Sequence, residues 1–77
     1  MSIKDLIEKE DFDFISFRLV LSEEEDIFAG AAMSEKGKLI SLDGDVYSES
    51  AKIIKSERWT NEEENIKNGI TVWVEGF

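Results

Sequence analysis

The chain has 77 residues, of which 18 are Asp or Glu and 9 are Lys or Arg, so its formal net charge is −9. It contains no Cys and no His, which excludes disulfides, thiolate metal sites and the usual general base of hydrolytic enzymes. A hydrophobic fraction of 42%, with two Trp and five Phe, is enough for one small core. We therefore expect one folded domain over residues 1–77.

The N-terminal segment predicts a short helix over residues 3–9. Ser2 is a suitable N-cap, and Asp5 stands three positions later as an acidic version of the capping-box residue. One apolar face follows at helical spacing, made by Ile3, Leu6 and Ile7.

Residues 12–21 are aromatic and branched, which predicts the first strand. Ile15 and Phe17 alternate with polar residues, whereas Phe12 and Phe14 have the opposite parity. Two interpretations remain open: the strand is apolar on both faces at its start, or a bulge switches its face near Ile15.

The rest of the chain predicts four more strands joined by turns. Residues 27–33 form the second, where small residues would let the helix pack closely; a helix over 23–32 is the alternative. Gly37 suits a tight turn with positive φ. Further strands are expected over 38–42, 51–59 and 70–75, with a ten-residue polar loop over 60–69. The simplest closure is an α+β fold in which one N-terminal helix packs on a four- to five-stranded antiparallel meander.

No catalytic or metal-binding constellation emerges from the residues. Asp43-Gly44-Asp45 begins like a calcium loop, but Tyr47 and Ile54 occupy positions where that loop needs ligands. No Ser has a His to activate it, and no glycine-rich phosphate loop is present. We therefore expect a protein that is not an enzyme and uses no cofactor or metal.

Trp59 and Trp73 are expected in or near the core, facing each other across the last hairpin. The alternative is an exposed aromatic contact at an interface.

The negative charge is unevenly distributed along the chain. Residues 1–35 have a balance of −7, residues 36–58 of +1 and residues 59–77 of −3. The acids gather at the helix exit, in the first loop and in the last loop. From these clusters we predict a partner-binding surface made by Asp11, Asp13, Glu23, Glu24, Glu25, Asp26, Glu62, Glu63 and Glu64. Such a surface would steer the protein to a basic groove and away from nucleic acid or anionic membranes.

The second half of the chain resembles small proteins carried by phages and mobile elements. The resemblance lies in the turn Leu42-Asp43-Gly44-Asp45-Val46-Tyr47-Ser48, in a strand that ends at Trp59, and in the closing strand Ile70-Thr71-Val72-Trp73-Val74. Proteins of that origin include anti-CRISPR inhibitors. The resemblance implies a cytoplasmic protein of a bacterial host cell that occupies the basic nucleic-acid-binding surface of a target such as a CRISPR effector, and so blocks DNA or RNA binding.

A second hypothesis fits the same composition. The protein would be a non-catalytic interaction or accessory module, a monomer or a homodimer paired through an open sheet edge. Its acids would then serve solubility only, and its contact would be apolar, centred on Phe12, Phe14 or Trp73. The N-terminus has no apolar signal core, and no apolar run approaches the ~20 residues that span a bilayer.

Overall fold

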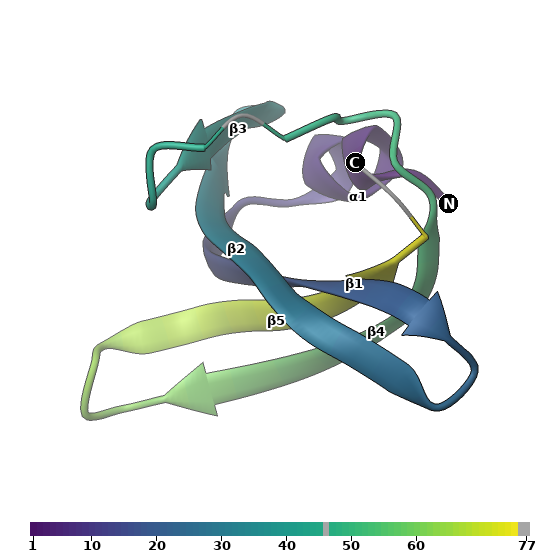
Figure 1. Cartoon of the computed structure of the whole chain (residues 1–77). Coiled ribbons are helices and arrows are strands. Elements are labelled where there is room, and N and C mark those ends of the chain that lie inside the picture. The colour runs from purple at the N-terminus through teal and green to yellow at the C-terminus, as the bar shows by residue number, and fades with distance from the viewer. Residues whose placement is uncertain (46, 76–77) are drawn as a thin grey trace.

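The computed structural model describes residues 1–45 and 47–75. Val46, part of the turn that carries the resemblance, lies outside the described residues. One helix precedes five strands (Figure 1). The elements are α1 (Ile3–Lys9), β1 (Phe12–Ser22), β2 (Glu25–Glu35), β3 (Lys38–Ser41), β4 (Ile53–Asn61) and β5 (Ile66–Val74).

The predicted helix is confirmed with its cap. The Ser2 hydroxyl accepts a hydrogen bond from the Asp5 amide, and the Asp5 carboxylate accepts one from the Ser2 amide, which completes a capping box. The bond from the Ser2 backbone lowers the pKa of the Asp5 carboxyl below its usual value. Ile3, Leu6 and Ile7 are buried, as their spacing predicts.

The sheet is mixed, which corrects the expected antiparallel meander. Its strand order is β3-β2-β1-β5-β4, and β1 pairs with β5 in parallel, with Phe14 opposite Gly69 and Leu19 opposite Val74. The first and last strands are thus neighbours at the centre. The other three pairs are antiparallel. Because β3 and β4 lie at opposite edges, the chain between them crosses the sheet on the same side as α1 (Figure 1).

The two interpretations of the start of β1 both hold, because a bulge is present and Phe14 lies on the opposite face from Phe12, against Trp59. Phe12 pairs with Ser34 and Ile15 with Ala32, so β1 contains one more residue than β2 between these two pairs. The extra residue brings both Phe12 and Ile15 to the buried side, where they are at most 1% exposed. Phe12 is therefore a core residue and not the accessible apolar contact of the second hypothesis.

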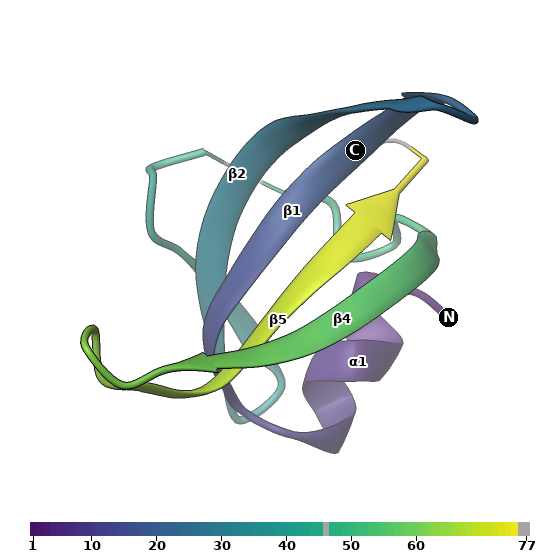
Figure 2. The same cartoon turned by 90° about the horizontal axis from the view of Figure 1, so that it is seen from below.

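The core lies between the sheet and the layer made by α1 and the β3–β4 connection. It contains Ile3 and Ile7 from the helix, Ala51 from the connection, and inward-facing residues of β1 and β5, among them Phe17 and Val72. The sheet curls around the helix, and no described element covers its other side, which we call the outer face (Figures 1 and 2).

The small residues of β2 make room for Tyr47 and not only for the helix. A Cβ at Gly30 would lie 1.9 Å from the Tyr47 hydroxyl, so only glycine fits beneath this ring. The ring also packs on Phe17, with centroids 4.7 Å apart. Glycine is needed here for close approach.

The turns agree with the sequence in one place and differ in another. Lys36 and Gly37 both have positive φ, 53° and 78°, which is the geometry of a two-residue hairpin turn. The expected ten-residue loop over 60–69 is shorter, because β4 runs to Asn61 and β5 begins at Ile66. Pairing between β4 and β5 thus extends into a segment whose polar composition predicted a loop.

The two tryptophans do not face each other, contrary to expectation. Trp59 pairs with Gly69, and Trp73 pairs with Lys55. Both rings are half-buried on the outer face. The Trp59 ring covers Gly69, and its indole nitrogen donates to the Thr71 hydroxyl at 3.0 Å. The register of β4 on β5 decides which residues lie opposite each other, and the local sequence pattern does not specify that register.

Candidate functional site

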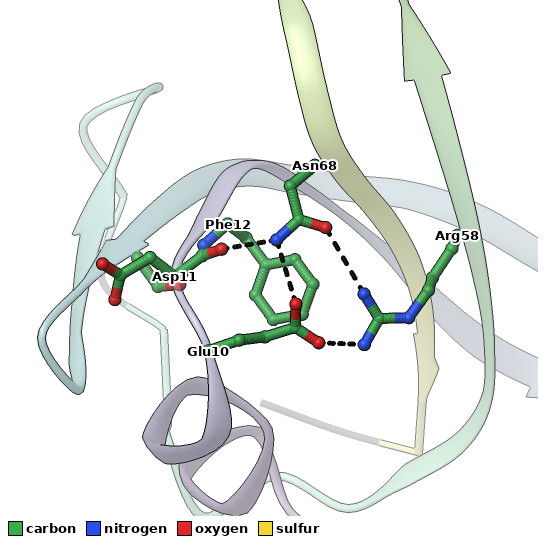
Figure 3. A network of polar contacts seen from close by, with 6 residues as sticks. Glu10, Asp11, Phe12, Arg58 and Asn68 are labelled. Carbon is green, nitrogen blue, oxygen red and sulfur yellow. Dashed lines mark hydrogen bonds and ion pairs between the residues drawn. The ribbon is translucent and has the colours of Figure 1, made fainter.

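The acids at the helix exit take part in folding. Figure 3 shows Glu10 held between two side chains: it forms an ion pair with Arg58 of β4 and accepts a hydrogen bond from the Asn68 amide of β5 at 3.1 Å. The same amide group donates to the Asp11 carbonyl at 2.6 Å, and Arg58 also lies over the Phe12 ring. The Arg58 guanidinium lowers the pKa of the Glu10 carboxyl. This network fastens the end of α1 to the far strands.

Asp11 and Asp13 are occupied by backbone amides. Asp11 accepts from the Lys36 amide at 2.8 Å, so it holds the β2–β3 turn. One oxygen of Asp13 accepts from the amides of both Lys67 and Asn68 at 3.0 Å, where β5 begins. Acids that are unfavourable at a helix C-terminus are explained here by the loops that they hold.

Asp26 is also engaged, because its carboxylate pairs with Arg18 across the β1–β2 ladder. Three of the nine predicted contact residues, Asp11, Asp13 and Asp26, therefore have partners within the chain. Six glutamates remain, and all are exposed. Across residues 1–45 and 47–75 no hydrogen bond or ion pair of their carboxylates is found.

These six glutamates form two acidic tips. The first tip, Glu23 to Glu25, closes the β1–β2 hairpin, and the second, Glu62 to Glu64, closes the β4–β5 hairpin. Because β1 and β5 run in the same direction, the β1–β2 turn follows the end of β1 while the β4–β5 turn precedes the start of β5. The tips consequently lie at opposite ends of the sheet (Figure 2), about 30 Å apart along a strand as long as β1.

The outer face stretches between the tips and carries aromatic side chains. Phe14 and Trp59 meet there, with ring centroids 5.6 Å apart. Trp73 lies further along β5, with the Lys55 ammonium 4.6 Å from its ring centroid. Phe28 is 59% exposed on the same face, opposite Arg18. One exposed ring beside three half-buried rings on a single sheet face is typical of a contact surface.

Sequence reasoning missed one polar cluster, which is built around Asp43. Its carboxylate accepts hydrogen bonds from the Tyr47 hydroxyl, the Ser41 hydroxyl and the backbone amide of Ala31. The tyrosine hydrogen bond is the main cause that lowers the pKa of Asp43 to about 2. Burial, followed by the same bond, raises the pKa of Tyr47 to about 12. The cluster fastens the connection to β2 where β3 has ended.

The aspartate turn that begins like a calcium loop has its first carboxylate, that of Asp43, engaged within the chain. The Asp43 oxygens point to donors of the chain itself. Among the described residues no group of three or more acidic side chains is arranged to hold a metal ion. The described part of the chain also has no helix long and apolar enough to cross a membrane.

Comparison of the chain with protein-family models, with curated proteins and with solved structures finds no match. The candidate site therefore stands on its own geometry: two acidic tips with an aromatic sheet face between them.

Proposed function

We propose that this protein is a small non-catalytic binding protein that docks on a basic surface of a partner protein through its two acidic tips. The observation that carries the proposal is that both long hairpins end in three consecutive exposed glutamates whose carboxylates form no ion pair with the described residues. A carboxylate without an intramolecular ion pair can bind a cation of the partner without breaking an interaction that stabilises the fold.

The spacing of the tips suggests the shape of the partner. A length of about 30 Å of duplex carries roughly 17 phosphates, whereas the two tips offer six free carboxylates at two points. The protein would thus engage two basic patches at the ends of a groove, and would not imitate a continuous strand. In the finer form of the proposal, the groove is the nucleic-acid-binding surface of a bacterial effector, such as a CRISPR effector, and docking excludes DNA or RNA.

The test is capture of bacterial proteins on the immobilised chain at low and high salt, after nuclease treatment. The first tip is neutralised as Glu23→Gln with Glu24→Gln and Glu25→Gln, and the second as Glu62→Gln with Glu63→Gln and Glu64→Gln. Asp26 is left unchanged because it pairs with Arg18. We expect each tip variant to reduce the recovery of a nucleic-acid-binding protein by about tenfold, and high salt to release it.

A matched control removes the same charge elsewhere. Glu8, Glu35 and Glu49 are exposed and lie outside both tips, and their triple change to Gln alters the net charge by the same amount. The control should retain capture. If the control loses capture as much as the tip variants do, bulk charge is responsible and the proposal is wrong.

A second candidate function is favoured by the exposed aromatic face. Phe28 and Trp73 would contact an apolar partner surface, with the acids serving solubility only. Salt separates the two functions, because an apolar contact hardly weakens as ionic strength rises.

A further inference from the structure

The outer face is hollowed at the end that carries the first tip. A shallow groove of about 580 Å³ lies there between the β1–β2 hairpin, the start of β4 and the end of β5. Its apolar lining comes from Val20, Leu21, Ile54 and Trp73. Leu21 and Ile54 are 54% and 49% exposed, so this lining is open to solvent. We call it the Trp73 groove.

The charges around the groove are unbalanced. Glu23, Asp26 and Glu75 contribute three carboxylates to the lining, and Lys55 contributes one ammonium. Asp26 is already paired with Arg18, whereas Glu23 and Glu75 form no ion pair within residues 1–45 and 47–75. An apolar floor with two unpaired carboxylates at its rim is complementary to a segment that is both apolar and basic.

Trp73 adds a specific preference for a cation. Its ring already has the Lys55 ammonium 4.6 Å from the centroid, which shows that this ring face accepts a positive charge. Lys55 is itself exposed, and only its flexible side chain brings the ammonium to the ring. A guanidinium stacks on an aromatic face and pairs with carboxylates better than an ammonium does. An incoming arginine could therefore displace Lys55 from the ring.

From these observations we infer that the Trp73 groove binds an extended segment of a partner protein in which arginine alternates with an apolar side chain. The arginine stacks on Trp73 and pairs with Glu23 and Glu75, and the apolar side chain lies against Val20 and Ile54. This inference rests on the proposed function and gives the chemistry that the first tip would recognise.

The second tip does not offer the same chemistry. The hollow beside it, of about 320 Å³, is lined by Thr60, Glu62, Asn65, Ile66 and Lys67, without an aromatic ring. The hollow beside the second tip thus lacks the ring on which an arginine would stack in the Trp73 groove.

The probe is a fluorescein-labelled pentapeptide that alternates arginine and leucine. Its control carries citrulline, which keeps the shape of arginine without the charge. Binding to the full chain is followed by fluorescence anisotropy, and the indole N–H signals of the two tryptophans are followed by NMR. We expect the Trp73 signal to move. The Trp59 signal should move less, because Trp59 does not line the groove and its indole nitrogen donates to the Thr71 hydroxyl.

Three variants sharpen the test. Glu23→Gln with Glu75→Gln should weaken binding about fivefold, because two free anions are lost. The control pair Glu8→Gln with Glu49→Gln, exposed acids that are not part of the groove, should leave it unchanged. Lys55→Gln should strengthen binding about threefold, since it frees the face of Trp73. This gain supports stacking only together with the shift of the Trp73 indole signal, because removing any cation near the groove favours a cationic peptide.

The outcomes separate this inference from the proposed function. If citrulline binds as well as arginine, if the control pair weakens binding equally, or if the Trp73 signal does not move, the groove is not the site. Capture of a partner by both tips would then still support the proposed function. If capture is insensitive to both tips, the proposed function is wrong, whatever the peptide does.

Discussion

Two groups of carboxylates in this molecule have the same chemistry and different roles. Glu10, Asp11, Asp13 and Asp43 accept hydrogen bonds from side chains or backbone amides that lie far away in the sequence. The carboxylates of the tip glutamates accept none from the described residues. The first group fastens the helix and the connections to the sheet, and the second extends into solvent.

The difference shows that net charge is a poor guide to an interaction surface in so small a domain. A chain of this size buries only about 60% of its unfolded surface, so short polar side chains are used to hold its loops. The acids that do not hold loops are more informative than the net charge of −9, because they lie at defined places, the ends of the two hairpins. Four predictions test this division.

The largest effect on stability should come from Gly30→Ala, because the added methyl group would displace Tyr47 from the Asp43 cluster. The new Cβ would lie 1.9 Å from the Tyr47 hydroxyl and 2.5 Å from its ring carbon, so the ring must leave Phe17. We expect a loss of about 3 kcal/mol in the free energy of unfolding, measured by urea titration. In a Tyr47→Ala background the same change should cost little, and an undiminished cost there would contradict the explanation.

Asp13→Ala should have the next largest effect. It removes the acceptor of two backbone amides, at Lys67 and Asn68, and should lower the free energy of unfolding by about 2 kcal/mol. Asp45→Ala is the matched control, because no hydrogen bond of its exposed carboxylate is found in the described part of the chain. Equal losses for both variants would show that Asp13 is not an anchor.

The Asp43–Tyr47 pair predicts a smaller effect that depends on pH. The pKa of Asp43 falls from 3.8 to about 2 on folding, so its stabilisation is complete above pH 3.8 and is lost as pH falls toward 2. The pKa of Tyr47 rises from 10.0 to about 12, so its contribution is complete below pH 10 and is lost as pH rises toward 12.

Tyr47→Phe should cost about 1 kcal/mol at neutral pH and abolish the alkaline decline, as measured by thermal unfolding across both pH windows. An alkaline decline that persists unchanged in this variant would assign it to another group.

The smallest effect on folding should come from the tips. Replacing the three glutamates of either tip by Gln should change the free energy of unfolding by no more than about 0.5 kcal/mol. At low salt the change should be slightly stabilising, because it reduces the repulsion within a highly negative chain. Clear destabilisation by either triple change would place these residues with the anchored group.

Local patterns were enough to predict much of the fold. The capping pair Ser2 and Asp5 located the helix, and positive φ at Gly37 followed from the turn sequence. The parity break between Phe12 and Ile15 indicated a bulge as one of two possibilities. Each of these signals lies within a few residues of the feature that it predicts.

Features that depend on long-range pairing could not be predicted in this way. The parallel β1–β5 pair, the stagger of Trp59 and Trp73, and the seat of Tyr47 on Gly30 all require the strand order. The anchored state of Asp11 and Asp13 follows from the same order, because their donors belong to the β2–β3 turn and to β5. The charge pattern did not distinguish among the nine predicted contact residues. Only the strand order and register show which of them have partners within the chain.

The central parallel pair also has a consequence for how the protein folds during synthesis. Phe14 pairs with Gly69, so this ladder joins positions that are 55 residues apart (69 − 14). Until β5 has left the ribosome, β1 has a partner on one side only, and its buried residues lack half of their neighbours. Non-local pairing of this kind slows folding. The nascent chain must therefore carry its aromatic β1–β2 hairpin exposed until β5 has been made, and the acidic turn at the end of this hairpin would oppose association during that interval.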